Sequence, residues 1–327
     1  MKPHHFLKAV VLAFAVAHTG VSSAAPKLDL AGYVGDDGAI SVLHQGKSAD
    51  PYFAIQALLL AHDNAVNVSA VAEKFINWLL RKQKPDGTFD RFCRTADTPW
   101  TACKVADADD ALLALWMRLL QTMPTQLAQN QLWMKSYRTS QASLERLYQP
   151  SRGIYMVSPV YLHGLFMDNL EVWSFKSHLK QRGQQAEAAK LAKAIRETFW
   201  NPVDQRFLVS TQLEQRFEKP AFYPDHVAQI FPLLVDFPSG AGDSRSFYRA
   251  WMSAHRAEWL AQGKKDYPWG VIAVLALRQN DTSSVQCWLR EAAGNRHSSR
   301  WAVTDETAYQ IVTGRGLTPA APNASCS

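Results

Sequence analysis

Acidic residues recur in front of apolar stretches along this chain. Six segments share this design, an acid followed by a mostly apolar run of helical length, and their first acids are Asp50, Asp107, Asp168, Asp225, Asp266 and Asp305. The steps between these acids are 57, 61, 57, 41 and 39 residues. Self-similarity on this scale is typical of repeat architectures, so the chain is expected to fold as a series of similar units.

The segments between the acid-led runs have a different pattern. Apolar and charged residues alternate there with a helical period, which is typical of helices with one face in water, over residues 68–84, 131–148, 184–200, 244–262 and 283–294. The acid-led runs are apolar nearly all round and are therefore expected to be buried on most sides. This alternation predicts an all-α fold, an (α/α)6 barrel in which an inner ring of helices is wrapped by an outer ring. No clear twelfth helix is present, so the N-terminal segment closes the ring or the ring stays open.

Three connections have strand-like composition. Residues 87–94, 152–162 and 205–217 are rich in aromatic and β-branched residues and start near a glycine or a turn, which predicts short β-hairpins over one rim of the barrel. The end of the chain, from about residue 314, is rich in Pro, Ala and Ser and is expected to be loose.

The first 24 residues have the pattern of a secretory signal peptide. A basic start precedes a short apolar run and a stretch of small residues, with cleavage expected after Ala24. The apolar run is too short for a membrane helix, and no later run reaches 18 unbroken apolar residues. We therefore expect residues 25–327 to form a single barrel domain in the periplasm or outside the cell.

The charge and the cysteines of the chain limit which partners and which compartment fit it. Loss of residues 1–24 would remove Lys2 and Lys8 and no acid, lowering the formal charge from +6 to +4. The remaining Lys and Arg residues are scattered, which argues against a nucleic-acid partner. Cys93 and Cys103 lie ten residues apart, and an exported protein can keep them as a disulfide. Cys287 and Cys326 are able to form a second pair.

The acids have a structural and a chemical interpretation. Asp is a preferred N-cap residue, so each acid can simply cap its helix. Capping does not explain helices with several acids, such as the pair Asp107 and Asp110 or the pair Asp168 and Glu171, whose members lie three residues apart on one helix face. Crowded carboxyls raise one another's pKa, and a protonated acid beside an ionised one is what glycoside hydrolysis requires. We expect Asp110 and Asp168 to be catalytic, with Asp107, Glu171 and Asp225 as supports or alternates.

Aromatic residues near these acids are candidates for sugar binding. Trp100, Tyr223 and Trp269 lie close to acids in sequence, and Trp100 and Trp269 are preceded by proline, which favours a rim position. His163 and Glu306 are further candidates for substrate contacts. No spacing indicates a zinc site or a cofactor, GKS at 46–48 lacks the earlier glycine of a phosphate loop, and no GxSxG or HExxH motif occurs.

Four stretches resemble bacterial proteins of the six-hairpin glycosidase superfamily: DPYFAIQALLLA, DGTFDRF, DADDALLALWMRLL and FMDNLEVW, within residues 40–315. This resemblance implies an (α/α)6 barrel, carbohydrate chemistry on a polysaccharide or oligosaccharide, and Asp or Glu catalysts where inner-helix N-termini converge. Cellulases with this barrel have a Glu proton donor near the first inner helix, whereas this chain has Asp50 there, so it departs from the cellulase pattern.

Two other functions fit parts of the sequence. A non-catalytic barrel that binds a polysaccharide and assists exopolysaccharide export or assembly would share the same cleft, with all its acids used as caps. The DADD motif at 107–110 and KQKPDGTF also resemble class II terpene cyclases, in which a DxDD aspartate protonates an alkene. Those enzymes have two helical domains and about twice this length, and they act on lipids inside the cell.

Overall fold

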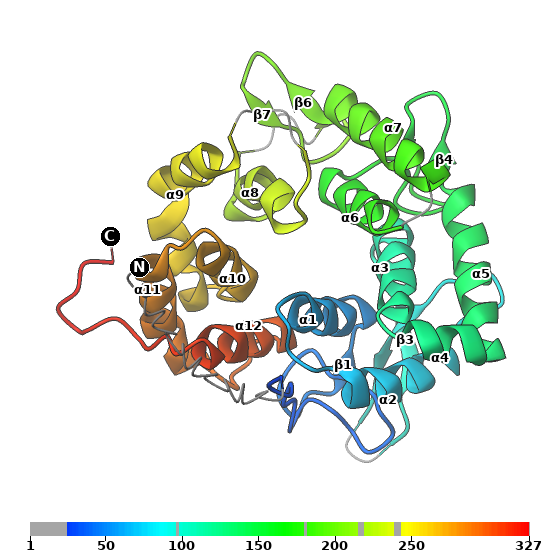
Figure 1. Cartoon of the computed structure of the whole chain (residues 1–327), viewed down its shortest axis with the longest axis horizontal. Helices are drawn as coiled ribbons and strands as arrows, with labels where there is room; N and C mark the ends of the chain where they lie inside the picture. Colours follow the sequence, from blue (N-terminus) through cyan, green and yellow to red (C-terminus); the bar gives the residue numbers. More distant parts are fainter. Residues whose placement is uncertain (1–24, 96–97, 180–181, 215–218, 239–242, 327) are drawn as a thin grey trace, which may run out of the picture.

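The computed structural model describes residues 25–95, 98–179, 182–214, 219–238 and 243–326. The expected signal peptide lies outside these residues. Six helices form an inner ring, as predicted: α1 (Pro51–Asp63), α3 (Asp109–Gln121), α6 (Phe166–Ser177), α8 (Val227–Leu234), α10 (Gly270–Arg278) and α12 (Val303–Gly314). Each contacts the next in chain order, and α12 contacts α1, so the ring is closed (Figure 1).

In the described part of the chain, five amphipathic helices form most of the outer layer, and their bounds follow the predicted amphipathic segments closely. They are α2 (Ser69–Leu80), α5 (Gln131–Arg146), α7 (Arg182–Phe199), α9 (Ser244–Leu260) and α11 (Thr282–Ala292). A short helix, α4 (Pro124–Gln129), precedes α5. The inner helices bury most of their residues while the outer ones bury one face, as their composition requires.

The N-terminal segment takes the place of a sixth outer helix. The backbone N–H of Asp29 donates to the Gln310 side chain of α12 (3.0 Å), and the N–H of Val303 donates to the carbonyl of Val42 (2.8 Å). Among the described residues no helix is long and apolar enough to cross a membrane.

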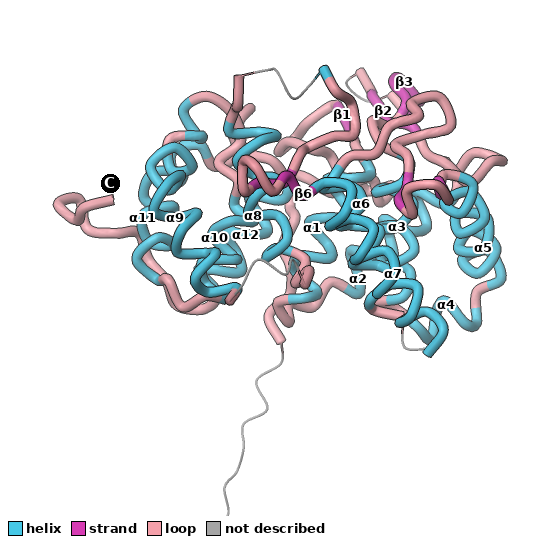
Figure 2. Tube along the Cα trace, turned by 90° about the horizontal axis from the view of Figure 1, so that it is seen from above, coloured by secondary structure: helices cyan, strands magenta, loops and turns pink. Residues whose placement is uncertain are grey.

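Short antiparallel strands lie in the loops between helices, as predicted (Figure 2). One sheet has the order β1-β2-β3, and two hairpins follow it, β4-β5 and β6-β7. Residues 215–217 of the third predicted segment lie outside the described residues. The strands are β1 (Ser48–Ala49), β2 (Asp90–Cys93), β3 (Thr101–Val105), β4 (Tyr148–Gln149), β5 (Ile154–Tyr155), β6 (Trp200–Asn201) and β7 (Arg206–Phe207).

Two disulfides pair the cysteines that the sequence analysis paired. Cys93–Cys103 links β2 to β3, and Cys287–Cys326 links α11 to the C-terminal tail. The tail is also held by a hydrogen bond from the Ala320 N–H to the Gln286 carbonyl (2.9 Å). The expectation of a loose tail is therefore wrong for residues 315–326, because these contacts tie it to α11.

Candidate active site

Two of the first acids of the six acid-led segments accept hydrogen bonds from backbone N–H groups at helix N-termini. Asp50 caps α1, accepting a hydrogen bond from the Tyr52 N–H (3.0 Å). Asp305 accepts hydrogen bonds from the N–H groups of Ala302 (3.1 Å) and Gly270 (2.8 Å), so it joins the starts of α12 and α10. For these positions the capping interpretation is sufficient.

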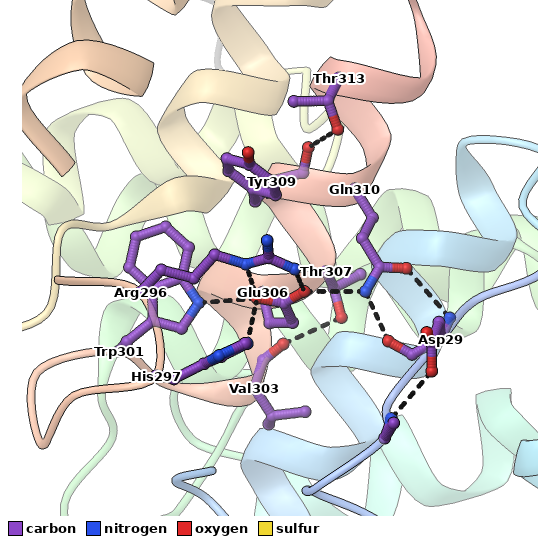
Figure 3. A network of polar contacts seen from close by, with 11 residues as sticks. Asp29, Arg296, His297, Trp301, Val303, Glu306, Thr307, Tyr309, Gln310 and Thr313 are labelled. Atoms are coloured by element: carbon purple, nitrogen blue, oxygen red, sulfur yellow. Dashed lines mark hydrogen bonds and ion pairs between the residues drawn. The ribbon is translucent and has the colours of Figure 1, made fainter. Parts of the chain in front are cut away.

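Glu306 is also fully occupied (Figure 3). Its buried carboxylate accepts two hydrogen bonds from the Arg296 guanidinium (2.7 and 2.9 Å), one from the Trp301 indole (3.0 Å) and one from the Gln310 amide (3.0 Å). These contacts anchor α12 to the loop before it, so the structure gives Glu306 a structural role. Its predicted contact with substrate stays a prediction.

Helices α3 and α6 begin differently, because neither is capped by a side chain. The first N–H groups of α3 donate to the carbonyl of Val157, from Asp109 at 2.8 Å and from Asp110 at 3.4 Å. The first N–H of α6, from Phe166, donates to the carbonyl of Val209 (2.9 Å). Loop carbonyls thus do the work of caps, and among the acids of these two starts Asp110 also accepts a hydrogen bond from the Ala111 N–H (2.9 Å).

Three carboxyl groups from these helices form the carboxyl cluster of Asp110, Asp168 and Glu171. Each has one buried oxygen without a hydrogen-bond partner in the described part of the chain. The other oxygen of Glu171 accepts hydrogen bonds from the Tyr52 hydroxyl and the Gln56 amide of α1, both at 2.9 Å. Buried polar atoms normally have partners, so these unpartnered oxygens at converging helix starts make the cluster the candidate active site.

Burial raises the pKa of every carboxyl in this cluster. The pKa of Asp168 rises to about 7, through burial and then through the charge of Asp107. The pKa of Glu171 rises to about 8, through burial and then through the charge of Asp168. Burial, followed by the charge of Asp168, places the pKa of Asp110 well above its ordinary value. The cluster therefore holds protons near neutral pH, as a general acid must.

The acids of the DADD motif separate in space. Asp110 is completely buried, whereas the Asp107 side chain is 67% exposed and forms an ion pair with Arg91. Arg91 also pairs with the capping carboxylate of Asp50 (2.7 Å). The pKa of Asp109 is raised to about 6, mainly by burial. The next largest influence on this pKa is the charge of Lys84. Within the DADD motif, Asp107 is therefore the exposed, ion-paired acid, and its charge influences the pKa of Asp168.

Aromatic side chains border the carboxyl cluster. Tyr223 is 55% exposed and lies against Trp269, with ring centroids 5.3 Å apart. The pKa of Tyr223 rises to about 12, by partial burial and then by the charges of Asp168 and Glu171. Tyr223 is therefore within electrostatic reach of the cluster, and it lies beside Trp269, the other aromatic residue predicted near this site.

Three other predicted residues occupy different positions. Trp100 is buried beneath the guanidinium of Arg94, 4.4 Å from its ring centre, so its prediction as a rim residue is wrong; the ring packs in the core instead. His163 is partly buried in the loop whose Val157 carbonyl receives the start of α3. Asp225 accepts a hydrogen bond from the Ala221 N–H (3.0 Å) within its own turn.

No protein-family model and no curated protein sequence matches this chain. Similar solved structures include one described as a novel alpha-amylase from Clostridium perfringens (TM-score 0.59, 9% identity, 86% of this chain and 94% of that chain). Others are a D-mannose isomerase (0.52, 10%, 87% and 94%) and a GH63 mannosylglycerate hydrolase from Thermus thermophilus in complex with glucose (0.51, 10%, 85% and 96%). The chain has the six-hairpin glycosidase-type (α/α)6 barrel fold.

The six-hairpin barrel also reveals site residues that the sequence analysis missed. Tyr52 and Gln56 were not singled out, yet their side chains hold Glu171 from across the ring. One signal was present, because a polar Gln lies in an otherwise apolar inner helix, where a polar side chain needs a partner.

Proposed function

We propose that this protein is an exported glycoside hydrolase in which Asp168 is the general acid and Asp107 the general base. The observation that supports this most strongly is the carboxyl cluster, because each of its carboxyls has one buried, unpartnered oxygen and a raised pKa. A non-catalytic binder would have its acids consumed as caps. Asp50, Asp305 and Glu306 are consumed in structural contacts, whereas Asp110, Asp168 and Glu171 each keep one oxygen without a partner among the described residues.

The roles follow from accessibility. Asp110 has no exposed surface and Glu171 only 3%, so neither reaches a substrate directly. Asp168 is partly exposed, and Asp107 is exposed beside it. The proposed general acid and general base are therefore Asp168 and Asp107, and not Asp110 and Asp168 as the sequence suggested. Asp110 and Glu171 become positioning residues at the buried end of the cluster, while burial and the charge of Asp107 keep the proton on Asp168.

The proposed reaction is a direct displacement by water. Asp168 donates its proton to the glycosidic oxygen as the bond from that oxygen to the anomeric carbon breaks. Asp107, as the carboxylate, takes a proton from the water whose oxygen bonds to the anomeric carbon. Asp168 ends as a carboxylate and Asp107 as an acid, and exchange with solvent restores both. This scheme inverts the anomeric configuration.

The substrate class is a polysaccharide or oligosaccharide, such as a bacterial exopolysaccharide. Tyr223 and Trp269 would stack on sugar rings, in keeping with the general preference of flat aromatic faces for apolar surfaces. Two of the similar structures are described as an amylase and a mannosylglycerate hydrolase, and this supports a sugar substrate. The two disulfides fit an oxidising compartment such as the periplasm or the exterior.

The test is reducing-end release from a panel of bacterial exopolysaccharides and plant glucans. We expect Asp168→Asn and Asp107→Asn each to lower kcat by about 100-fold or more, the usual contribution of a general acid or base. Asp236→Asn is the matched control. Asp236 is exposed just after the end of α8, and its carboxylate pairs with Arg278. Full activity in Asp168→Asn would refute the assignment. Binding to a polymer without release by the wild type would instead support the binding protein.

A further inference from the structure

A cluster of histidines and a carboxylate lies outside the carboxyl cluster. His226 ends the short π-helical turn Phe222–His226, while His255 and Glu258 lie one turn apart on α9. The His226 Nδ1 is 2.8 Å from the Glu258 Oε2, and the His255 Nδ1 is 3.9 Å from that oxygen. One ligand-type atom from each residue lies within 4.8 Å of the other two. The three side chains thus converge from two elements onto one point.

We propose that His226, His255 and Glu258 bind a divalent transition-metal ion of the Zn²⁺ class. Two imidazoles and one carboxylate are donors that this ion takes at about 2.0–2.2 Å. A tetrahedral site with these bond lengths separates its donors by about 3.3 Å, so small rotations of the side chains are sufficient. Their exposed fractions of 25%, 24% and 40% leave a way in for the ion and a fourth position for water.

The contacts around the cluster favour ligation over a plain hydrogen-bonded pair. The two imidazole rings stack with centroids 4.1 Å apart, so simultaneous positive charge on both would be repulsive. The Trp251 indole donates to the His226 carbonyl (2.8 Å) and packs on His255 (centroids 5.3 Å), which orients both ligands.

A second histidine pair provides an internal comparison. His44 and His297 also stack, with centroids 4.2 Å apart, and His297 lies 3.5 Å from the Glu306 carboxylate. That carboxylate is already saturated by Arg296, Trp301 and Gln310. A metal ion there would have to displace an arginine, so stacking alone does not make a site.

The ion would connect the two layers of the barrel. The turn Phe222–His226 carries Tyr223 at the border of the carboxyl cluster, while α9 belongs to the outer ring. Ligation would fix this turn on α9 and so hold the Tyr223 ring in place. This consequence for substrate binding rests on the proposed function, whereas binding of the ion does not.

The test uses the full chain, purified without a histidine tag and stripped with EDTA. Zn²⁺ is titrated by calorimetry and Co²⁺ by visible absorption. We expect one Zn²⁺ per chain, a Co²⁺ d–d band and a rise in Tm on adding Zn²⁺. His255→Ala and Glu258→Gln should each weaken binding at least tenfold, and His44→Ala, the matched control, should leave it unchanged.

Two outcomes would overturn the proposal. One is the absence of stoichiometric Zn²⁺ binding to the wild type, and the other is unchanged affinity in both His255→Ala and Glu258→Gln. Far-UV circular dichroism checks that the variants fold, and the Glu258→Gln change preserves side-chain shape. Titration of Asp168→Asn separates the two proposals, because that variant should lose hydrolysis and keep the metal ion.

Discussion

The carboxyl cluster should make the barrel less stable as the pH rises from acid to neutral. Asp168 has an ordinary pKa of 3.8 and a folded pKa of about 7. Between these values the folded chain keeps a proton that the unfolded chain has lost, so the free energy of unfolding falls with rising pH. The favourable contribution is complete below pH 4 and is lost as the pH rises through about 7.

The size of the effect follows from the shift. Each pKa unit corresponds to about 1.4 kcal/mol, so Asp168 alone accounts for at most about 4 kcal/mol, and more than half of this falls between pH 5 and pH 8. Glu171 has a pKa raised to about 8, partly by the charge of Asp168, so its own contribution shrinks when Asp168 is removed. Asp168→Asn should therefore flatten the pH dependence by about 2 to 4 kcal/mol.

The assay is urea unfolding of the wild type and Asp168→Asn at pH 5, 6, 7 and 8. The variant should be the more stable protein at pH 8, by up to about 4 kcal/mol, and this difference should shrink to less than half at pH 5. Asp236→Asn, which changes an exposed acid, should run parallel to the wild type. If the wild-type and Asp168→Asn profiles are parallel, Asp168 does not hold a proton in the folded state, and its role as general acid loses its basis.

Three further predictions test other parts of the structure. Glu306→Gln removes the charge that Arg296 pairs with and should lower the free energy of unfolding by about 2 kcal/mol in urea melts; an unchanged midpoint would contradict the anchoring role. Tyr223→Ala should raise KM about fivefold with little change in kcat, because stacked contacts of this kind contribute about 1 kcal/mol; Tyr148→Ala, an exposed ring on β4, should change neither. Cys287→Ser with Cys326→Ser opens a bond that spans 39 residues and should cost about 3 to 4 kcal/mol in the oxidised protein; equal Tm values would show that the tail contributes nothing.

The fold was predictable because it depends on periodicity. Residues 109–121 and 166–177 are apolar nearly all round and 244–260 are amphipathic, and these patterns correctly assigned the helices to the inner and outer rings. The closure of the ring was left open, since irregular segments such as residues 25–49 have no period to read.

The site was only partly predictable because its details depend on tertiary contacts. The sequence identified Asp168 and Glu171 as more acids than a helix needs, but it held no sign that a loop carbonyl from Val209 would replace a cap. Burial of Trp100 follows from packing under Arg94, which its flanking residues do not reveal. The histidine cluster was missed because His226 reaches His255 and Glu258 only when the inner and outer layers are assembled.

The closure of the ring by the first and last inner helices has a consequence for how the chain acquires its structure. The Asp29 and Gln310 contact joins residues 281 positions apart, and α1 packs directly on α12. During synthesis, the apolar flank of α1 has no partner until residue 314 has emerged. Contacts at such large sequence separation form slowly. The helices that are made first therefore form an open stack, in which the α12-facing side of α1 stays uncovered. A chain of this design needs protection from aggregation over almost the entire length of its synthesis.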